Sequence, residues 1–349
     1  ELIKAINLHL NADVGVAISL SSGVDSSLLA SLVRKCNIGH NLKAFTVEFE
    51  DFANEGSLAL EHAKRNQLKH IVTRFNKSDF LPILKEQIKI QDAPTGGLMN
   101  LGQYLNFKTV SDHNVKVLLD GAGIDEAFGG YKVSHLNYLK ELKQIKSDSY
   151  EKEKIKFNKF WEEDPSQIEY LLSAENYFES EIDGTSDKLR NAVKGELSFS
   201  TLEFKKYLLY NKKLRRGLRM KDRASMKNSI ELRVPFVDKE VIKNGLTINS
   251  KNNFHNGISK AVIRKIGYSL ANENVFYKKK KNINAPQSAW LVNKYDEVES
   301  LCMSIYEGLN ILDSKKIQKE LISLKDGTIK NSFGIWRLMN AALMMEIFE

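Results

Sequence analysis

The chain has 349 residues, of which 42% are apolar and 28% are charged, and its 52 Lys and Arg exceed its 44 Asp and Glu by 8. This composition is typical of a globular protein and excludes disordered, collagen-like and coiled-coil chains. No stretch reaches the roughly 20 uninterrupted apolar residues of a membrane span, and two cysteines, Cys36 and Cys302, are too few for a disulfide framework. We therefore expect a cytoplasmic protein that does not act at a membrane.

The first third of the chain alternates short apolar runs with amphipathic segments. Residues 14–19 are typical of a strand buried on both faces, and a helix-like segment follows directly. The alternation then predicts strands over 42–49, 69–75 and 114–120, and helices over 56–66, 78–90 and about 98–112, with Ser78 or Asp79 as an N-cap. This order predicts an α/β protein with a doubly wound parallel sheet.

The texture changes beyond Tyr131. From about 135 to 215 the chain is rich in Lys and Glu, with apolar residues at helical spacing, and it ends in an amphipathic stretch over 333–348. We expect the Met and aromatic residues of that last stretch to pack in a core. The predicted organisation is a parallel-sheet part over 1–134 and a mainly helical part over 135–349 within one unit.

Two basic clusters in the C-terminal half carry much of the positive charge. Such clusters belong to solvated helix faces, to a polyanion pocket such as a nucleotide triphosphate site, or to a nucleic-acid surface. No aromatic-interleaved RNA-binding motif and no Cys/His finger spacing supports the last alternative, so we expect no nucleic-acid partner. The clusters are Lys278 to Lys281 and the group Lys212, Lys213, Arg215, Arg216, Arg219, Lys221 and Arg223.

The loop after the first predicted strand, residues 20–27, reads LSSGVDSS. Small residues let the backbone turn tightly, and N–H groups and serine hydroxyls before a helix N-terminus form a cradle for phosphate. Asp25 would repel phosphate without a divalent cation between them, so the loop predicts Mg²⁺ bound to a polyphosphate. The Walker ending is absent, so the usual NTPase loop has no support; the plain alternative is a helix cap.

A second loop, residues 120–126, follows the strand predicted over 114–120 and carries Asp125 and Glu126. Ligands in open parallel sheets bind beyond the carboxyl ends of the strands, where both loops are expected. Two carboxylates from two loops can share a metal ion, so the two loops together predict a shared metal site. The alternative is that Asp125 and Glu126 only cap the following turn.

These loops, taken with two later blocks, resemble the synthetase domain of asparagine synthetases, in the PP-loop ATP pyrophosphatase superfamily. The family loop LSGG(L/V)DSS is matched by Leu20 to Ser27, with Ser22 for the first glycine, and the second signature is matched by Asp120 to Tyr131. The DRASM and RVPF-D block is matched within 222–238, and the K-x-x-F-x-x-P segment by Lys280, Ile283 and Pro286, followed by Trp290 and Leu291. The four blocks stand in the family's order over about residues 10–291.

The resemblance implies a PP-loop-type sheet that binds ATP and a helical part that completes the active site. It implies adenylation of a carboxylate with release of pyrophosphate, followed by attack of ammonia to give the amide and AMP. Aspartate is the expected carboxylate, and ATP and Mg²⁺ are the expected cofactors, with Mg²⁺ held by Asp25 and Asp125. By carry-over, the catalytic residues are Lys280, Asp125 and Glu126; ATP and pyrophosphate contact Leu20, Ser21, Ser22, Gly23, Asp25, Ser26, Ser27, Val47 and Gly121; and Arg223, Glu231 and Arg233 either shape the substrate pocket or form an ion-pair network.

The match departs from the family at Ala122, where asparagine synthetases carry Glu or Asp, as well as at Ile124 and Ser22. Alanine accepts no proton, so either a neighbour such as Glu126 or Glu231 substitutes, or the enzyme amidates a different carboxylate. A PP-loop tRNA-modifying enzyme is a competing hypothesis, but the chain shows no RNA-binding extension or catalytic cysteines. A nucleotide-binding scaffold without catalysis is the non-enzymatic alternative.

Nitrogen supply is the other departure, because glutamine-using asparagine synthetases carry an N-terminal glutaminase domain with a terminal Cys nucleophile. Three explanations stand: the domain was cut away, it is a separate subunit that acts as a partner, or free ammonia is used. The start at Glu1 rather than Met favours truncation.

Overall fold

The computed structural model describes residues 1–36, 42–52, 55–168, 172, 200–272, 274–277, 285–308, 314–329 and 331–348. Lys280, one of the predicted catalytic residues, lies outside the described residues together with its neighbours in the run Lys278 to Lys281. Much of the segment predicted to be helical, residues 169–171 and 173–199, also lies outside them. Within the described part, no helix is both long and apolar enough to cross a membrane.

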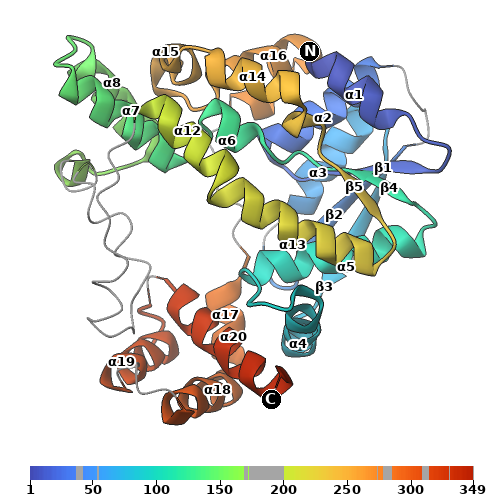
Figure 1. Ribbon diagram of the computed structural model, residues 1–349, viewed down its shortest axis with the longest axis vertical. Helices are drawn as coiled ribbons and strands as arrows, with labels where there is room; N and C mark the ends of the chain where they lie inside the picture. The colour runs from blue at the N-terminus through green and yellow to red at the C-terminus, as the bar shows by residue number, and fades with distance from the viewer. Residues whose placement is uncertain are drawn as a thin grey trace.

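A parallel sheet forms the centre of the fold, with strand order β3-β2-β1-β4-β5 (Figure 1). From β1 the chain moves outward through β2 to β3, and then returns to place β4 on the other side of β1. The loops that leave β1 and β4 therefore diverge at a switch point, where such sheets bind ligands. The predicted doubly wound sheet is confirmed, with strands β1 (Val16–Ser19), β2 (Lys43–Phe49), β3 (Lys69–Phe75), β4 (Val117–Leu119) and β5 (Glu231–Arg233).

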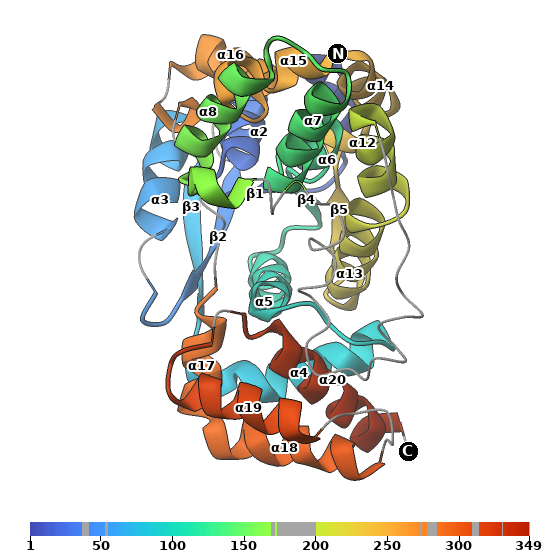
Figure 2. The same ribbon diagram turned by 90° about the vertical axis from the view of Figure 1, so that its left-hand side faces the viewer.

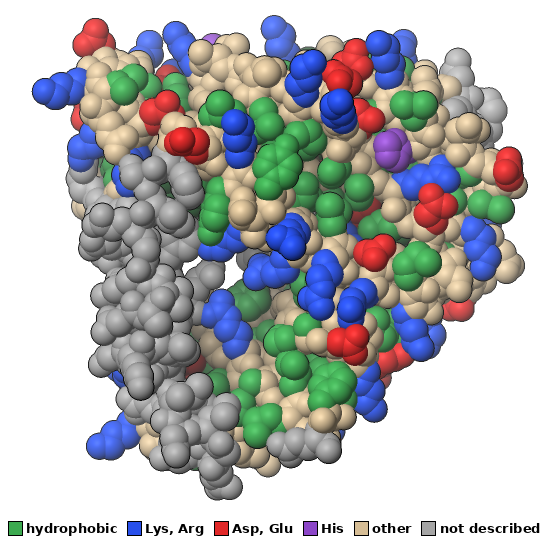
Figure 3. Space-filling view, in the orientation of Figure 1, with side chains coloured by type: hydrophobic (Ala, Val, Ile, Leu, Met, Phe, Trp, Pro, Cys, Tyr) green, Lys and Arg blue, Asp and Glu red, His purple; other side chains and the backbone are tan. Residues whose placement is uncertain are grey.

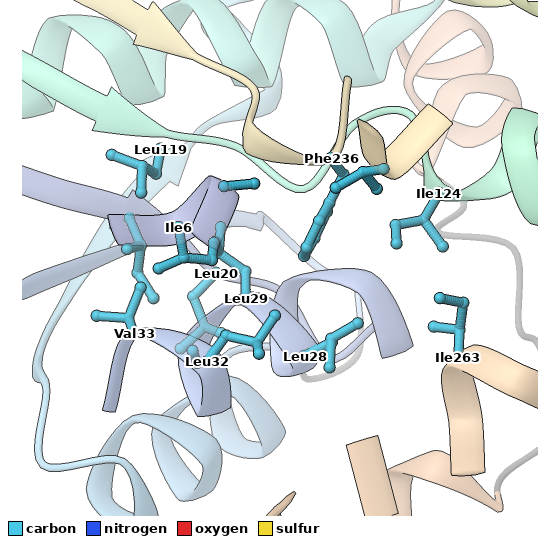
Figure 4. Close-up of a cluster of buried hydrophobic side chains, with 14 of the residues drawn as sticks. Ile6, Leu20, Leu28, Leu29, Leu32, Val33, Leu119, Ile124, Phe236 and Ile263 are labelled. Atoms are coloured by element: carbon cyan, nitrogen blue, oxygen red, sulfur yellow. The ribbon is translucent and has the colours of Figure 1, made fainter. Parts of the chain in front are cut away.

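Helices cover both faces of the sheet and bury its central strands, β1 and β4, on both sides. Ile18 and Leu119 pack with α1 (Leu2–Leu10), α2 (Val24–Lys35) and α3 (Glu55–Arg65), in the apolar cluster drawn in Figure 4. Their neighbours Ala17 and Leu118 pack on the opposite face against α5 (Leu98–Asp112) and α13 (Lys213–Lys227). This alternation follows from the two-residue period of a strand.

The C-terminal helices form a separate apolar cluster against α4 (Phe80–Gln91) and the ends of β2 and β3. Trp290 packs edge-on against Phe75, with 4.9 Å between ring centroids. Figures 1 and 2 place this cluster at the end of the molecule opposite α15 and α16. Its helices are α17 (Gln287–Asn293), α18 (Tyr295–Gly308), α19 (Ser314–Lys325) and α20 (Phe333–Phe348).

The remaining elements lie around the carboxyl edge of the sheet and at the other end of the molecule (Figure 2). They are α6 (Ile124–Phe128), α7 (Lys132–Gln144), α8 (Tyr150–Trp161), α12 (Thr201–Tyr210), α14 (Lys239–Thr247), α15 (Ser250–Asn253) and α16 (Ala261–Ala271). Short 3-10 turns are η1 (Lys77–Asp79), η2 (Pro165–Gln167), η3 (Pro235–Val237), η4 (His255–Gly257) and η5 (Asn274–Phe276).

Most predicted elements agree with the structure. The strand over 69–75 and the helices over 98–112 and 333–348 have the predicted bounds, and Trp336 and Met339 of the last are buried as expected. The strands predicted over 14–19 and 114–120 are shorter, because pairing between them begins at Val16 and Val117. The helix predicted from residue 78 begins at Phe80 after a 3-10 turn, and Asp79 occupies its N-cap without a side-chain hydrogen bond.

One strand has no counterpart among the predictions. β5 lies within the part predicted to be mainly helical, and its residues Glu231 and Leu232 pair with Val117 and Leu118 of β4. Its sequence, Glu-Leu-Arg, has too little apolar pattern to indicate a strand. The division of the chain at residue 134 stays a prediction.

Candidate functional site

The two loops singled out in the sequence lie against each other at the carboxyl edge of the sheet. A Cβ added at Gly121 would lie 3.3 Å from the carbonyl carbon of Asp25 and 3.4 Å from the backbone nitrogen of Ser26. Gly123 adopts a φ of +106°, which disfavours other residues, and it opens the short helix α6 that carries Asp125. The start of α2 and the start of α6 are thus brought together by glycines.

Hydrogen bonds among its serines hold the first loop. The backbone N–H of Ser21 donates to Oγ of Ser26 over 3.1 Å, and the N–H of Gly23 donates to Oγ of Ser21 over 3.2 Å. Gly23 is the N-cap of α2 and provides no side-chain cap. The positive end of the α2 dipole and its first amides are therefore available to an anion.

A buried lysine joins the two loops. Nζ of Lys260 lies 2.7 Å from Oδ1 of Asp25 and 2.7 Å from Oδ1 of Asp125, and only 4% of its side chain is exposed. Burial lowers the pKa of Lys260, but the charges and hydrogen bonds of Asp125 and Asp25 more than offset this, so the pKa is raised overall. The lysine is therefore a charged ammonium between two carboxylates.

Local structure holds Lys260 in place. It is the N-cap of α16 and adopts a left-handed conformation, with φ of 55°. The buried guanidinium of Arg264 donates to the carbonyl of Ser259 over 2.8 Å and so fixes the turn before the lysine. Gly130 leaves space beside Asp125, because any side chain there would collide with the Asp125 carboxylate.

A first cavity of about 230 Å³ lies between β1, β2 and α5. Its walls are largely apolar, from side chains such as Phe45, Phe49 and Met99, and it is open at one side. A flat, mostly apolar group such as a purine fits walls of this kind. Six of the residues predicted to contact ATP line it: Leu20, Ser21, Asp25, Ser26, Val47 and Gly121.

A second cavity, also about 230 Å³, lies between α6 and α13. Its charged lining comes from Asp25, Asp125 and Glu126 on one side and from Lys213 and Lys221 on the other. The residues that line both cavities, and so mark where they meet, are Asp25, Gly121, Ala122 and Lys221.

A hydrogen-bonded pair lines the second cavity. Tyr131 donates its hydroxyl to Oε1 of Glu126 over 2.6 Å, and Nζ of Lys213 lies 4.0 Å from the centre of the Tyr131 ring. Burial raises the pKa of Glu126, and the Tyr131 hydrogen bond opposes that rise. The pKa of Tyr131 is also raised, first by burial and then by the charges of Asp125 and Glu126.

Lys221 occupies the junction of the two cavities. Its Nζ lies 2.7 Å from Oδ1 of Asp120, and the same carboxylate oxygen accepts a hydrogen bond from the backbone N–H of Ala122 over 2.9 Å. A cation therefore lies beside Ala122, the position at which the family that this sequence resembles carries Glu or Asp. Figure 3 shows Lys and Arg side chains gathered where α13 crosses the face of the molecule that is turned toward the viewer.

Other predicted site residues line neither cavity. Arg223 donates to the backbone carbonyl of Gln91 over 2.6 Å and so ties α13 to the end of α4. Arg233 pairs with Glu231 over 2.8 Å and donates to the carbonyl of His9. Ser22 and Gly23 belong to the loop but do not face the cavities, and Ser27 is fully buried.

Lys260 is the site residue that the sequence did not indicate. It stands 235 positions from Asp25, and the residues around it read only as the start of an amphipathic helix. Lys213 and Lys221 did carry a signal, because the basic cluster to which they belong was compatible with a polyanion pocket.

The donor set for a metal ion is small. Within the described ranges, no group of three or more His, Cys, Asp or Glu side chains converges as a metal site. Asp25 and Asp125 instead point one oxygen each at a single cation, the Lys260 ammonium. Mg²⁺ is usually bound by one or two carboxylates together with substrate phosphates and water, so two convergent carboxylates beside a phosphate cradle fit this ion.

Comparison with known proteins gives a consistent picture. Residues 1–348 match the family described as asparagine synthase. The chain is 27% identical over 320 residues to the glutamine-hydrolyzing asparagine synthetase 1 of Bacillus subtilis strain 168, a match that covers 85% of this chain and 50% of that protein. A putative glutamine-hydrolyzing asparagine synthetase of Mycobacterium tuberculosis strain H37Rv is 23% identical over 99% of this chain and 57% of its own length.

A shorter match extends to a protein with a different name. The amidase chyE of Penicillium rubens is 28% identical over 156 residues, which is 40% of this chain and 23% of that protein. The chain thus spans about half the length of the asparagine synthetases it matches.

Proposed function

The chain belongs to the asparagine synthase family, and from this we propose that it is an ATP-dependent ligase that converts a carboxylate into an amide, with release of AMP and pyrophosphate. The observation that carries the proposal is the convergence on buried Lys260 of Asp25, which lines both cavities, and Asp125, which lines the second. The apolar cavity, the serine loop and the charged cavity follow one another in space. This order suits ATP in the first part and an acid in the last, so that the two meet end to end.

Adenosine would occupy the first cavity. Leu20 and Val47 would flank the adenine, and Gly121, whose lack of a side chain keeps the loops in contact, would approach the nucleotide through its backbone. The phosphates would then extend over Ser21, Ser26 and the N-terminus of α2, where amides and hydroxyls neutralise their charge.

Asp25 and Asp125 would hold Mg²⁺, which supplies the positive charge that lets an anionic carboxylate approach an anionic phosphate. Lys260, a buried cation beside both aspartates, would move to the phosphates when those carboxylates bind the metal ion. Lys280, by its place in the family motif, would stabilise the departing pyrophosphate.

The reaction balances in two steps. A carboxylate oxygen of the acid forms a bond to the α-phosphorus of ATP, and the bond from that phosphorus to the bridging oxygen breaks, so that pyrophosphate leaves with the electron pair. Ammonia then adds to the carbonyl carbon of the acyl-adenylate, loses a proton, and AMP departs. Glu126 lies in the second cavity next to Asp125 and is our candidate acceptor for that proton.

The family relationship favours aspartate as the acid. A different carboxylate is the alternative, because Ala122 replaces the Glu or Asp of asparagine synthetases. Ammonia would come from a glutaminase domain or subunit, or directly from solution. The ATP-binding part over 1–134 and the helical part over 135–349 would complete one active site, because Lys213, Lys221 and Lys260 come from the second part.

The test is a turnover assay. We would measure AMP and pyrophosphate release from ATP with Mg²⁺ and ammonium, and compare aspartate with a panel of other carboxylic acids. Release that depends on an acid, with its amide formed in equal amount, is the expected result. Tight ATP binding without release on any acid would overturn the proposal and favour a nucleotide-binding scaffold.

A further inference from the structure

Five residues of α13 line the second cavity, and three of them lie along one face of the helix. Lys213, Gly217 and Lys221 are spaced four residues apart, and residues at this spacing stand above one another on a helix. Their α-carbons span about 12 Å at a rise of 1.5 Å per residue. The cavity is therefore bordered by a glycine with a lysine at either end.

Gly217 is not explained by the helix itself. A glycine inside a helix costs about 1 kcal/mol relative to alanine, and this one has neither a left-handed φ nor a close neighbour, since an added Cβ would meet nothing within 4 Å. The missing side chain leaves space in the cavity. Ala122, across the junction, leaves further space where the family carries a longer acidic side chain.

The two lysines are held at opposite ends of this space. Lys221 lies at the junction with the first cavity, where it pairs with Asp120, and Lys213 lies over the Tyr131 ring. A cation at the junction suits the carboxylate that reacts with ATP. A cation at the far end suits a second anionic group on the same acid substrate. A charge-assisted hydrogen bond to that group would hold the substrate along the length of the cavity.

On the basis of the proposed function, we infer that the acid is a dianion longer than aspartate, held along α13 with its reacting carboxylate at Lys221 and its distal anion at Lys213, over the gap left by Gly217. Aspartate, with two carbons between its carboxylates, is short for this span. The competing occupant of the α13 face is the pyrophosphate part of ATP.

The first experiment compares acids by length and by distal charge. Succinate, adipate and suberate are assayed for pyrophosphate release with ATP, Mg²⁺ and ammonium, each against the monocarboxylate of the same length: butyrate, hexanoate and octanoate. We expect kcat/KM to be at least about tenfold higher for adipate or suberate than for the matched monocarboxylate. Equal values within each pair, or a clear preference for succinate, would overturn the inference.

The second experiment uses variants of α13. Gly217→Leu fills the gap with a better helix former, and Lys213→Met removes the distal cation while keeping an aliphatic side chain. Both are expected to raise KM for adipate about tenfold and to leave KM for ATP unchanged. Lys227→Met, an exposed lysine of the same helix, is the matched control and should change neither value. A rise in KM for ATP in place of that for adipate would assign the face to pyrophosphate.

A binding measurement separates this inference from the proposed function. Calorimetric titration of adipate into the protein with a non-hydrolysable ATP analogue needs no turnover. If no acid supports turnover but adipate binds and both variants weaken it, the proposed reaction fails and the assignment of the α13 face stands. Adipate binding that Gly217→Leu and Lys213→Met leave unchanged, or no binding, overturns the assignment. Urea unfolding of each variant verifies the fold.

Discussion

Nζ of Lys260 lies 2.7 Å from Oδ1 of Asp125, and the same ammonium lies 2.7 Å from Oδ1 of Asp25. The lysine thus occupies the place between two carboxylates that we propose for a metal ion. In the absence of that ion it keeps two negative charges from repelling each other inside the protein, where charge interactions are stronger than in water.

Replacing Lys260 with Met is therefore expected to destabilise the protein. Removing one partner of a buried ion pair leaves uncompensated charge and typically costs 3–5 kcal/mol; we expect about 2 kcal/mol, because the two aspartates are partly exposed. Mg²⁺ should restore part of the loss. Urea unfolding with and without Mg²⁺ measures both effects. Lys265→Met, an exposed lysine on the same helix, is the control, and equal stability of the two variants would contradict the expectation.

Replacing Asp125 with Asn tests the proposed reaction. The variant keeps the side-chain size and loses the charge, so we expect kcat/KM for pyrophosphate release to fall at least about 100-fold. The measurement is the acid-dependent release assay across a range of Mg²⁺ concentrations. Asp112→Asn changes an exposed aspartate at the end of α5 and should leave the rate unaltered. An active Asp125→Asn enzyme would remove the aspartate from the mechanism.

Glu126 is expected to make stability depend on pH in the acidic range. Burial raises its pKa in the folded protein above the ordinary value of 4.5. Between 4.5 and the raised pKa, the folded state therefore keeps a proton that the unfolded state has released. Its contribution to stability is present below pH 4.5 and is lost as the pH rises through the raised pKa. Glu126→Gln should therefore be more stable than the parent at neutral pH. Chemical unfolding from pH 4.5 to 8 measures this, and parallel pH profiles would contradict it.

Lys205 is expected to do the opposite in the alkaline range. It is 1% exposed, its Nζ donates to the carbonyl of Gly245 over 2.9 Å, and burial lowers its pKa to about 8. Between that pKa and the unfolded value of 10.5 the unfolded state binds more protons, so stability rises with pH by up to about 3 kcal/mol.

The matching variant is Lys205→Met, which should remove this alkaline rise and increase stability at neutral pH. Unfolding free energies at pH 7 and pH 10, taken as differences from the parent protein, give the comparison. The adjacent exposed Lys206→Met serves as the control. A Lys205→Met protein whose stability rises between these pH values as steeply as that of the parent would contradict the assigned pKa.

The sequence by itself determined four of the five strands of the sheet and both loops of the site. β3, α5 and α20 have their predicted bounds, and the loops at Asp25 and Asp125 meet at the predicted edge. These features are readable because burial of a strand on both faces, and the turn that ends it, impose a pattern on consecutive residues.

Only the tertiary structure decided what faces those loops. Lys260 stands 135 positions from Asp125, and β5 consists of three residues with no strand pattern of their own. The α13 face was readable as basic, but its position over the second cavity was not. The residues around such a side chain follow the packing pattern of its own helix. They carry no sequence pattern that indicates the charges which the side chain meets in the folded protein.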